Sequence, residues 1–182
     1  MSTLSYLKNF IRDPNVASVT PTSRFTINRV CKYIDFESDV KIIEYGPAEG
    51  VFTRVLLDKM TPGSQIIAIE TNKHFAKTLG DLKDGRLTVV NTTAEEVKGI
   101  ANNCNWEYAD YIISGIPFSF LEKEVRHRIL KDSAALLSEN GGFLGYQTSS
   151  HLKPFLSEHF KNVAIEMEYL NIPPMCIYIA KK

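Results

Sequence analysis

The stretch VKIIEYGPAEGVFTRVLLDKMTPGSQIIAIE, residues 40–70, decides the fold. Its start, VKIIEY (40–45), is a short apolar run rich in β-branched residues, which predicts a buried strand. A turn at 46–50 leads into a helical pattern over Val51–Met60, and QIIAIE (65–70) predicts a second strand. Strand, helix and strand in this order predict a βαβ unit with parallel strands.

The rest of the chain continues this alternation. Further strands are expected at 87–90, 108–115, 143–147, 163–170 and 175–181, and further helices at 72–83, near 94–100, at 121–137 and at 151–160. Glu139–Gly142 is expected to end the long helix with residues at φ > 0. The order predicts one α/β domain over residues 1–182, with a core from 38 to 182 that follows a helical arm at 1–34.

The segment Glu44-Tyr45-Gly46-Pro47-Ala48-Glu49-Gly50 spans the end of the first predicted strand and the turn after it, and this turn is rich in small residues. Small side chains let the backbone pass close to a ligand, and the next helix points free N–H groups at it. Glu70 ends the second strand, where a carboxylate can accept hydrogen bonds from both hydroxyls of a ribose. The loop does not fit the dinucleotide form G-x-G-x-x-G. A tight turn beside a solvated acid remains the alternative.

The EYGPAEG loop resembles the E-x-G-x-G-x-G cofactor loop of class I methyltransferases, with Ala48 in place of the middle glycine. The resemblance implies a Rossmann-like, seven-stranded sheet, mostly parallel with an antiparallel last strand and with helices on both faces. It implies S-adenosylmethionine as cofactor and no metal. Thr93-Ala94 stands where such enzymes commonly have Asp-Ala over the adenine, and Thr93 with Glu96 also fits a capping box. The cofactor-binding residues so implied are Glu44, Gly46, Pro47, Ala48, Gly50, Glu70, Thr71, Thr93, Ala94, Ser114 and Gly115.

The SGIPF segment, residues 114–118, is similar to the (N/D)-x-P-(Y/F) signature of amino-methyltransferases. In the rRNA adenine dimethyltransferases an Asn stands where this chain has Gly115, and it accepts a hydrogen bond from the target amine. An aromatic amine needs that acceptor because its lone pair is delocalised into the ring, whereas a deprotonated aliphatic amine is already nucleophilic. The alternative is a turn that ends a strand, with Phe118 in the core.

Nearly the whole chain resembles the bacterial phospholipid N-methyltransferases, which are related to the rRNA dimethyltransferases. The segments that carry the resemblance are FIRDPNVASVTPTSRF, EYGPAEGVFTRVLL, IAIETN, IISGIPF, FLGYQTSS and YLNIPPMCIYIA. The family implies stepwise methylation of phosphatidylethanolamine. The substrate side is expected to include Arg24, Ile116, Pro117, Phe118 and Tyr146, with Ser114 and Tyr146 as the candidate catalytic residues.

The composition limits the kinds of partner that this protein is expected to bind. Acidic and basic residues balance at 21 each, which disfavours nucleic acid as a partner. Cys31, Cys104 and Cys176 lack CxxC spacing, so reduced thiols in a cytoplasmic protein are expected. No stretch approaches the ~20 apolar residues that cross a bilayer. The composition leaves the oligomeric state open, and it leaves open a nucleic-acid methyltransferase, a small-molecule methyltransferase and a non-catalytic cofactor-binding relative.

An amphipathic pattern opens the chain. Leu4, Leu7 and Ile11 recur at helical spacing before Asp13-Pro14. Such a helix would either lie on the inner face of a membrane, as the family resemblance implies, or pack on the protein's own core.

Overall fold

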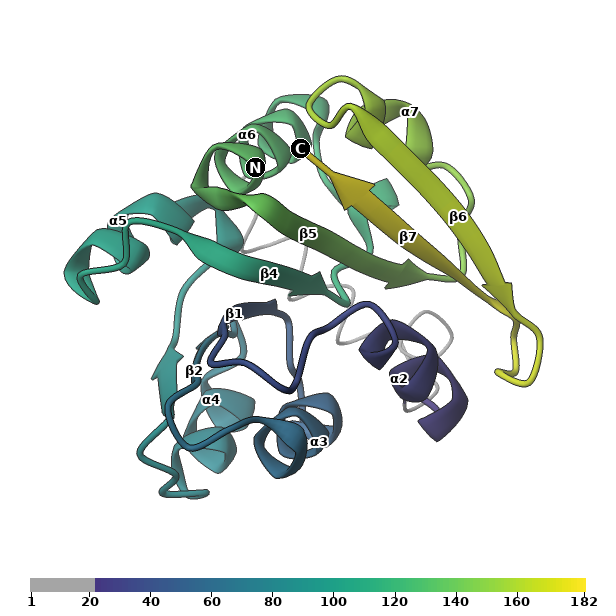
Figure 1. The fold of residues 1–182 in the computed structure, drawn as a ribbon. Helices are drawn as coiled ribbons and strands as arrows, with labels where there is room; N and C mark the ends of the chain where they lie inside the picture. The colour runs from purple at the N-terminus through teal and green to yellow at the C-terminus, as the bar shows by residue number, and fades with distance from the viewer. Residues whose placement is uncertain (1–21) are drawn as a thin grey trace.

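The structure, a computed structural model, describes residues 22–182. A seven-stranded sheet runs through it in the order β3-β2-β1-β4-β5-β7-β6 (Figure 1). The strands are β1 (Lys41–Tyr45), β2 (Gln65–Ile69), β3 (Leu87–Val90), β4 (Ala109–Ser114), β5 (Leu137–Gln147), β6 (Asn162–Glu168) and β7 (Met175–Lys181). Strands β1 to β5 pair in parallel, while β7 runs antiparallel to both of its neighbours. The expected mostly parallel sheet with an antiparallel last strand is confirmed.

Helices cover both faces of the sheet (Figure 1). They are α2 (Arg24–Cys31), α3 (Val51–Lys59), α4 (Lys73–Gly80), α5 (Val97–Asn103), α6 (Lys123–Leu136) and α7 (Lys153–Ser157), with short 3₁₀ turns η1 (Ala94–Glu96) and η2 (Phe118–Phe120). One apolar cluster joins α2 and α3 to the first face, and another joins α5, α6 and α7 to the second. Strand β1 supplies both clusters because its side chains alternate: Ile42 faces one and Ile43 the other.

The expectation for Glu139–Gly142 was wrong. Strand β5 begins at Leu137, directly after α6, and the segment lies inside it beside a register irregularity opposite Asp110. Neither Gly141 nor Gly142 has a positive φ. A Cβ on Gly141 would lie 3.0 Å from the Asp110 carbonyl oxygen. The glycine therefore permits a close approach of strands β4 and β5 rather than a left-handed turn.

The amphipathic segment around Leu4, Leu7 and Ile11 lies outside the described residues. Within them, no helix is long and apolar enough to cross a membrane.

Candidate active site

The expected site residues meet at the carboxyl edge of the sheet. The register pairs Tyr45 with both Ile69 and Ser114, and Ser114 with Gly145. The next residue along each strand therefore reaches the same edge: Gly46, Glu70, Gly115 and Tyr146. Strand order reverses between β1 and β4, and ligands of open α/β sheets bind at such a switch point.

The loop after β1 has a backbone path typical of glycine. Gly46, Ala48 and Gly50 have φ values of 67°, 50° and 77°, all in the left-handed region. Ala48 follows this path despite its methyl group, at a cost of about 1–2 kcal/mol. Gly50 is the N-cap of α3, so the first turn of that helix opens directly from the loop.

Glu44 is fully buried beside this loop. Thr53 Oγ1 donates to its Oε2 at 2.7 Å, whereas its Oε1 has no hydrogen-bond partner among the described residues. Burial raises the Glu44 pKa to about 7, Thr53 opposes the rise, and the charge of Glu70 adds to it. A buried carboxylate oxygen without a donor costs free energy, so the site suits a ligand that carries a cationic donor. The ammonium group of S-adenosylmethionine is a donor of this kind.

Glu70 connects two loops. Its carboxylate accepts hydrogen bonds from the backbone N–H of Ala48 at 3.0 Å and of Asn72 at 2.7 Å. Thr71 Oγ1 donates to the same group at 3.4 Å, and Asn91 Nδ2 donates to the Glu70 carbonyl at 2.7 Å. A carboxylate accepts about four hydrogen bonds, so Glu70 retains capacity for a ribose hydroxyl while it shapes the loop.

At the end of β3 the capping-box expectation was wrong. Thr93 precedes η1, but its side chain makes no capping hydrogen bond; instead its carbonyl accepts from the Glu96 N–H at 3.1 Å. The Thr93 side chain is half-buried and Ala94 is buried. The hydroxyl of Thr93 is thus not committed to the helix.

Gly115 lies against Tyr146. A Cβ on residue 115 would be 2.6 Å from the Tyr146 hydroxyl and 2.9 Å from its ring carbon Cζ. Ser114 is buried, and its Oγ accepts from the Ile116 N–H at 3.3 Å. Burial raises the pKa of Tyr146, the charge of Glu44 raises it further, and Thr22 opposes both. The Tyr146 hydroxyl therefore keeps its proton at neutral pH.

The remaining substrate candidates differ in their burial and in their neighbours. Ile116 and Pro117 are half-buried, and a Cβ on Gly46 would lie 3.4 Å from Ile116 Cγ1. Phe118 is 1% exposed and packs edge-on against Phe143 at 6.1 Å. Arg24 is exposed at the start of α2, with its guanidinium over the Phe25 ring at 5.2 Å. No acid among residues 22–182 forms an ion pair with it.

Gln147 is a polar residue of this edge that sequence reasoning missed. It is 8% exposed, and its Nε2 donates to the Ser149 carbonyl at 3.0 Å. Its Oε1 has no hydrogen-bond partner among the described residues, and a small cavity lined by Phe118 and Leu152 adjoins it. The signal was a polar residue at the end of the otherwise apolar strand FLGYQ.

Two further features involve residues outside the expected set. An open depression of about 270 Å³ lies between α3 and α4 and includes Glu49 and His74. On the outer side of α6, His127 Nδ1 lies 3.2 Å from His159 Nε2 and 3.5 Å from Glu158 Oε2. These three side chains are close enough to share a metal ion, and they belong to α6 and to the segment after α7.

Known proteins resemble the chain at several levels. The sequence model of the ribosomal RNA adenine dimethylase family matches residues 4–98. The ornithine lipid N-methyltransferase of Singulisphaera acidiphila is 24% identical over 177 residues, which cover 96% of this chain and 92% of that protein. The probable ribosomal RNA small subunit methyltransferase A of Pyrobaculum aerophilum is 28% identical over 128 residues, covering 67% of this chain and 46% of the relative.

Solved structures share the fold at low sequence identity. The N-methyltransferase NodS from Bradyrhizobium japonicum superposes with a TM-score of 0.70 at 11% identity, covering 90% of this chain and 99% of that one. The Burkholderia thailandensis 1,6-didemethyltoxoflavin-N1-methyltransferase, solved with S-adenosylhomocysteine, gives 0.71 at 14% identity, covering 98% and 85%. The family model spans just over half of the chain, and the chain belongs to the ribosomal RNA adenine dimethylase family of S-adenosylmethionine-dependent methyltransferases.

Proposed function

We propose that the protein transfers methyl groups from S-adenosylmethionine to the primary amine of a lipid headgroup such as that of phosphatidylethanolamine. The observation that carries the proposal is the pair Gly115 and Tyr146. Residue 115 has no side-chain amide to accept a hydrogen bond from an adenine amine, and the Tyr146 hydroxyl fills the place where such a side chain would begin. An aliphatic amine does not need that amide, because its lone pair is not delocalised.

The lipid relative supports the same acceptor class. The match to the ornithine lipid N-methyltransferase runs over nearly the full length of both chains, whereas the match to the ribosomal RNA methyltransferase covers less than half of that protein. Balanced acidic and basic residues add no general attraction for RNA.

In the proposed cofactor site the chain's own residues bind and orient. Glu44 Oε1 accepts from the cofactor's ammonium group, Glu70 accepts from the ribose, and the loop 46–50 approaches the methionine part. Thr71, Thr93 and Ala94 border the adenosine. The cofactor supplies an electrophilic methyl group, and the protein aligns the amine with it and excludes water.

On the substrate side, Tyr146 is proposed to hold the amine rather than deprotonate it. A neutral phenol can accept one hydrogen bond and donate another, but it cannot take up a proton from an ammonium group. The headgroup ammonium, with a pKa near that of lysine at about 10.4, therefore loses its proton to water before transfer. Ser114, Ile116 and Pro117 border the approach. Arg24, which forms no ion pair within residues 22–182, pairs with the headgroup phosphate.

Adenine methylation is the second candidate, favoured by the family match itself. Turnover measurements distinguish lipid methylation from adenine methylation. The substrates tested are vesicles of phosphatidylethanolamine, free phosphoethanolamine and ribosomal RNA. Vesicles of phosphatidylcholine serve as the blank. Product masses are read by mass spectrometry. The proposal expects methylated phosphatidylethanolamine and a rate that rises with pH. Methyl transfer to RNA alone, to the free headgroup alone, or cofactor binding without any turnover would each refute it.

A further inference from the structure

The loop between β6 and β7 presents the most exposed large apolar side chains of residues 22–182. Tyr169, Leu170 and Ile172 are 73%, 64% and 81% exposed, whereas the other large apolar side chains at the surface reach at most 46%. A cluster of this kind at one tip differs from the single apolar residues that ordinary surfaces carry, and it marks an interaction site.

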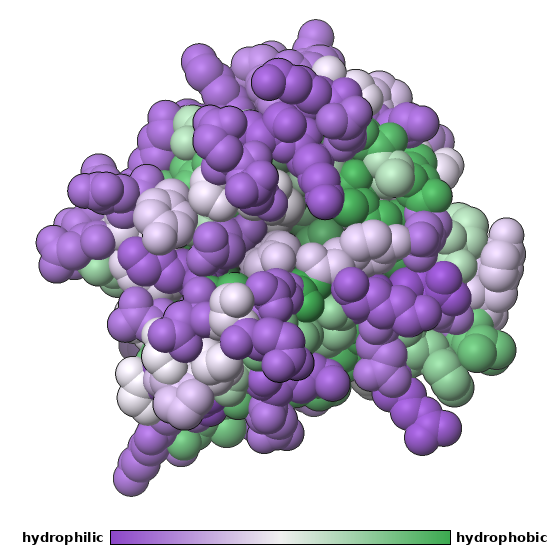
Figure 2. Space-filling view, viewed as in Figure 1, coloured by the Kyte–Doolittle hydropathy of each residue, from purple (hydrophilic) through white to green (hydrophobic). Residues whose placement is uncertain are grey.

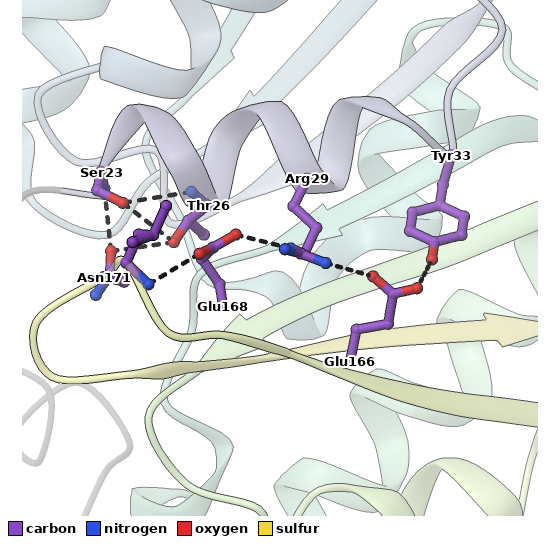
Figure 3. Close-up of polar contacts among 8 residues, drawn as sticks. Ser23, Thr26, Arg29, Tyr33, Glu166, Glu168 and Asn171 are labelled. Carbon is purple, nitrogen blue, oxygen red and sulfur yellow. Dashed lines mark hydrogen bonds and ion pairs between the residues drawn. The ribbon is translucent and has the colours of Figure 1, made fainter.

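The fold itself holds Leu170 and Ile172 in solvent, because Asn171 between them is buried and anchored by hydrogen bonds. Asn171 is 1% exposed, and its Oδ1 accepts from Thr26 Oγ1 at 3.0 Å and from the Ser23 N–H at 3.3 Å (Figure 3). Its Nδ2 donates to the Pro173 carbonyl at 2.7 Å. The buried Asn171 thus ties the tip to α2 while the side chains of Leu170 and Ile172 stay in solvent.

The base of the loop is fixed as well. Arg29 Nε donates to Glu168 Oε2 at 2.7 Å, and Glu168 Oε1 accepts from the Leu170 N–H at 2.9 Å (Figure 3). Arg29 also pairs with Glu166, which in turn accepts from the Tyr33 hydroxyl. Helix α2 and the hairpin therefore hold the apolar tip in one place.

The tip lies at the edge of the sheet that carries the candidate active site. Strand β6 ends and β7 begins there, and the register pairs Cys176 with Gln147 and Ile177 with Tyr146. Figure 1 shows the β6–β7 loop beside α2 at the right-hand end of the sheet, and Figure 2 shows apolar surface at that end. Arg24 and Phe25, both exposed, open α2 next to Ser23.

We propose that Phe25, Tyr169, Leu170 and Ile172, the docking tip, insert into the headgroup–acyl boundary of a lipid bilayer. The proposal rests on the proposed function, since an enzyme that methylates a membrane lipid has to bring its site to the bilayer surface. A fixed aliphatic and aromatic tip suits shallow insertion. Arg24 is exposed and forms no ion pair within residues 22–182, so its guanidinium suits anionic headgroups. Docking there turns the carboxyl edge of the sheet, with Gly115 and Tyr146, toward the lipid.

The test compares the full chain with the Leu170→Ser/Ile172→Ser variant in sedimentation with vesicles of phosphatidylethanolamine and phosphatidylglycerol. Both side chains are mostly in solvent, so the fold should be kept, which the thermal midpoint and the affinity for S-adenosylhomocysteine verify. Tyr108→Ser is the matched control, because Tyr108 is 44% exposed but precedes β4 at the opposite edge of the sheet. The variant should lose vesicle binding about tenfold or more, with turnover of monomeric short-chain phosphatidylethanolamine unchanged. The control should bind vesicles as the parent does.

Tyr169→Trp reports insertion directly, since the emission of an inserted indole shifts to the blue when vesicles are added. Unchanged vesicle binding by the double variant would overturn the proposal. So would emission that is already blue-shifted without lipid, which would mean that residues 1–21 or a second copy of the chain cover the tip. Analytical ultracentrifugation identifies the second copy. If vesicle binding depends on the tip but no lipid is methylated, docking stands and the proposed function fails.

Discussion

The Tyr146 hydroxyl occupies the space in which a side chain on Gly115 would have to begin, at 2.6 Å from that Cβ position. The two residues lie on neighbouring strand ends, and each restricts the other. Gly115 has no need of a left-handed φ, so its lack of a side chain reflects this contact rather than backbone conformation. The Gly115–Tyr146 contact therefore makes glycine at this position a specific requirement of the site.

Gly115→Ala should lower the free energy of unfolding by about 1–3 kcal/mol, the usual cost of overpacking. Gly99→Ala is the control: its Cβ would meet nothing within 4 Å in the exposed face of α5, so it should stabilise by about 0.5–1 kcal/mol. Tyr146→Phe removes the nearest atom and should recover part of the loss in the double variant. Urea unfolding measures the parent protein, the three single variants and the double variant, and equal stability of the two alanine variants would contradict the contact.

Ala48→Gly should leave stability unchanged or raise it by about 1 kcal/mol. Removing the strain of an alanine in the left-handed region gains about 1–2 kcal/mol of stability. Glycine makes the unfolded chain more flexible, which offsets about 0.5–1 kcal/mol of that gain. Binding of S-adenosylhomocysteine should be kept, because the loop path does not change. Calorimetric unfolding and titration check both expectations; a loss of more than 1 kcal/mol would mean that the methyl group makes a contact the cofactor loop depends on.

Glu44 should make stability depend on pH. Its folded pKa of about 7 lies above the ordinary 4.5, so the unfolded chain loses the proton first. The contribution of Glu44 to the free energy of unfolding is therefore fully present below the ordinary pKa. It is lost as the pH rises toward the folded pKa, and the total loss is roughly 3 kcal/mol. Glu44→Gln should remove this slope and be more stable than the parent protein above neutral pH, as urea unfolding across the range would show.

The same carboxyl should link cofactor binding to a proton. The proposed contact pairs the cofactor's ammonium group with ionised Glu44. The affinity for S-adenosylhomocysteine should therefore rise with pH up to the folded pKa and then level off, with release of a proton on binding. Titration calorimetry in buffers of different ionisation enthalpy measures that release. Glu44→Gln should bind more weakly and release no proton; a variant with the parent's affinity and pH profile would remove Glu44 from the cofactor site.

Glu70→Ala should weaken binding of S-adenosylhomocysteine by about 1.5–3 kcal/mol for each charge-assisted hydrogen bond lost. Because Glu70 also accepts from Ala48 and Asn72, loss of affinity alone does not identify a ribose contact. The 2′-deoxy analogue separates the roles: the parent should prefer the ribose form and the variant should not. A preference that survives in Glu70→Ala would assign the residue to the loop only.

Much of the fold could be predicted because its signals are local. The apolar run at 40–45 and the Gly/Pro turn after it predict β1, the loop and α3 within a residue or two. Gly141 misled the prediction because glycine serves both left-handed turns and close chain approaches, and only the neighbouring strand decides which. Thr93 misled it because the backbone, not the side chain, closes that turn.

The parts of the site that sequence could not provide depend on distant partners. Arg29 and Glu168 are 139 positions apart, and Thr26 and Asn171 are 145 apart, so nothing local predicts either contact. The complementarity of Gly115 and Tyr146 likewise appears only when β4 and β5 are paired. That Glu44 Oε1 lacks a hydrogen-bond partner within residues 22–182 is seen only once Thr53 is found to occupy the other oxygen.

A competition assay tests the central claim most directly. Vesicles containing phosphatidylethanolamine and a ribosomal RNA fragment are mixed in one reaction with limiting, methyl-labelled S-adenosylmethionine, and the label is counted in the separated lipid and RNA. The account predicts label in the lipid, as N-methylated headgroups, with the RNA at the level of a reaction without enzyme. Label in the RNA and none in the lipid would contradict it and would make this chain an adenine methyltransferase with a glycine in place of the expected amide.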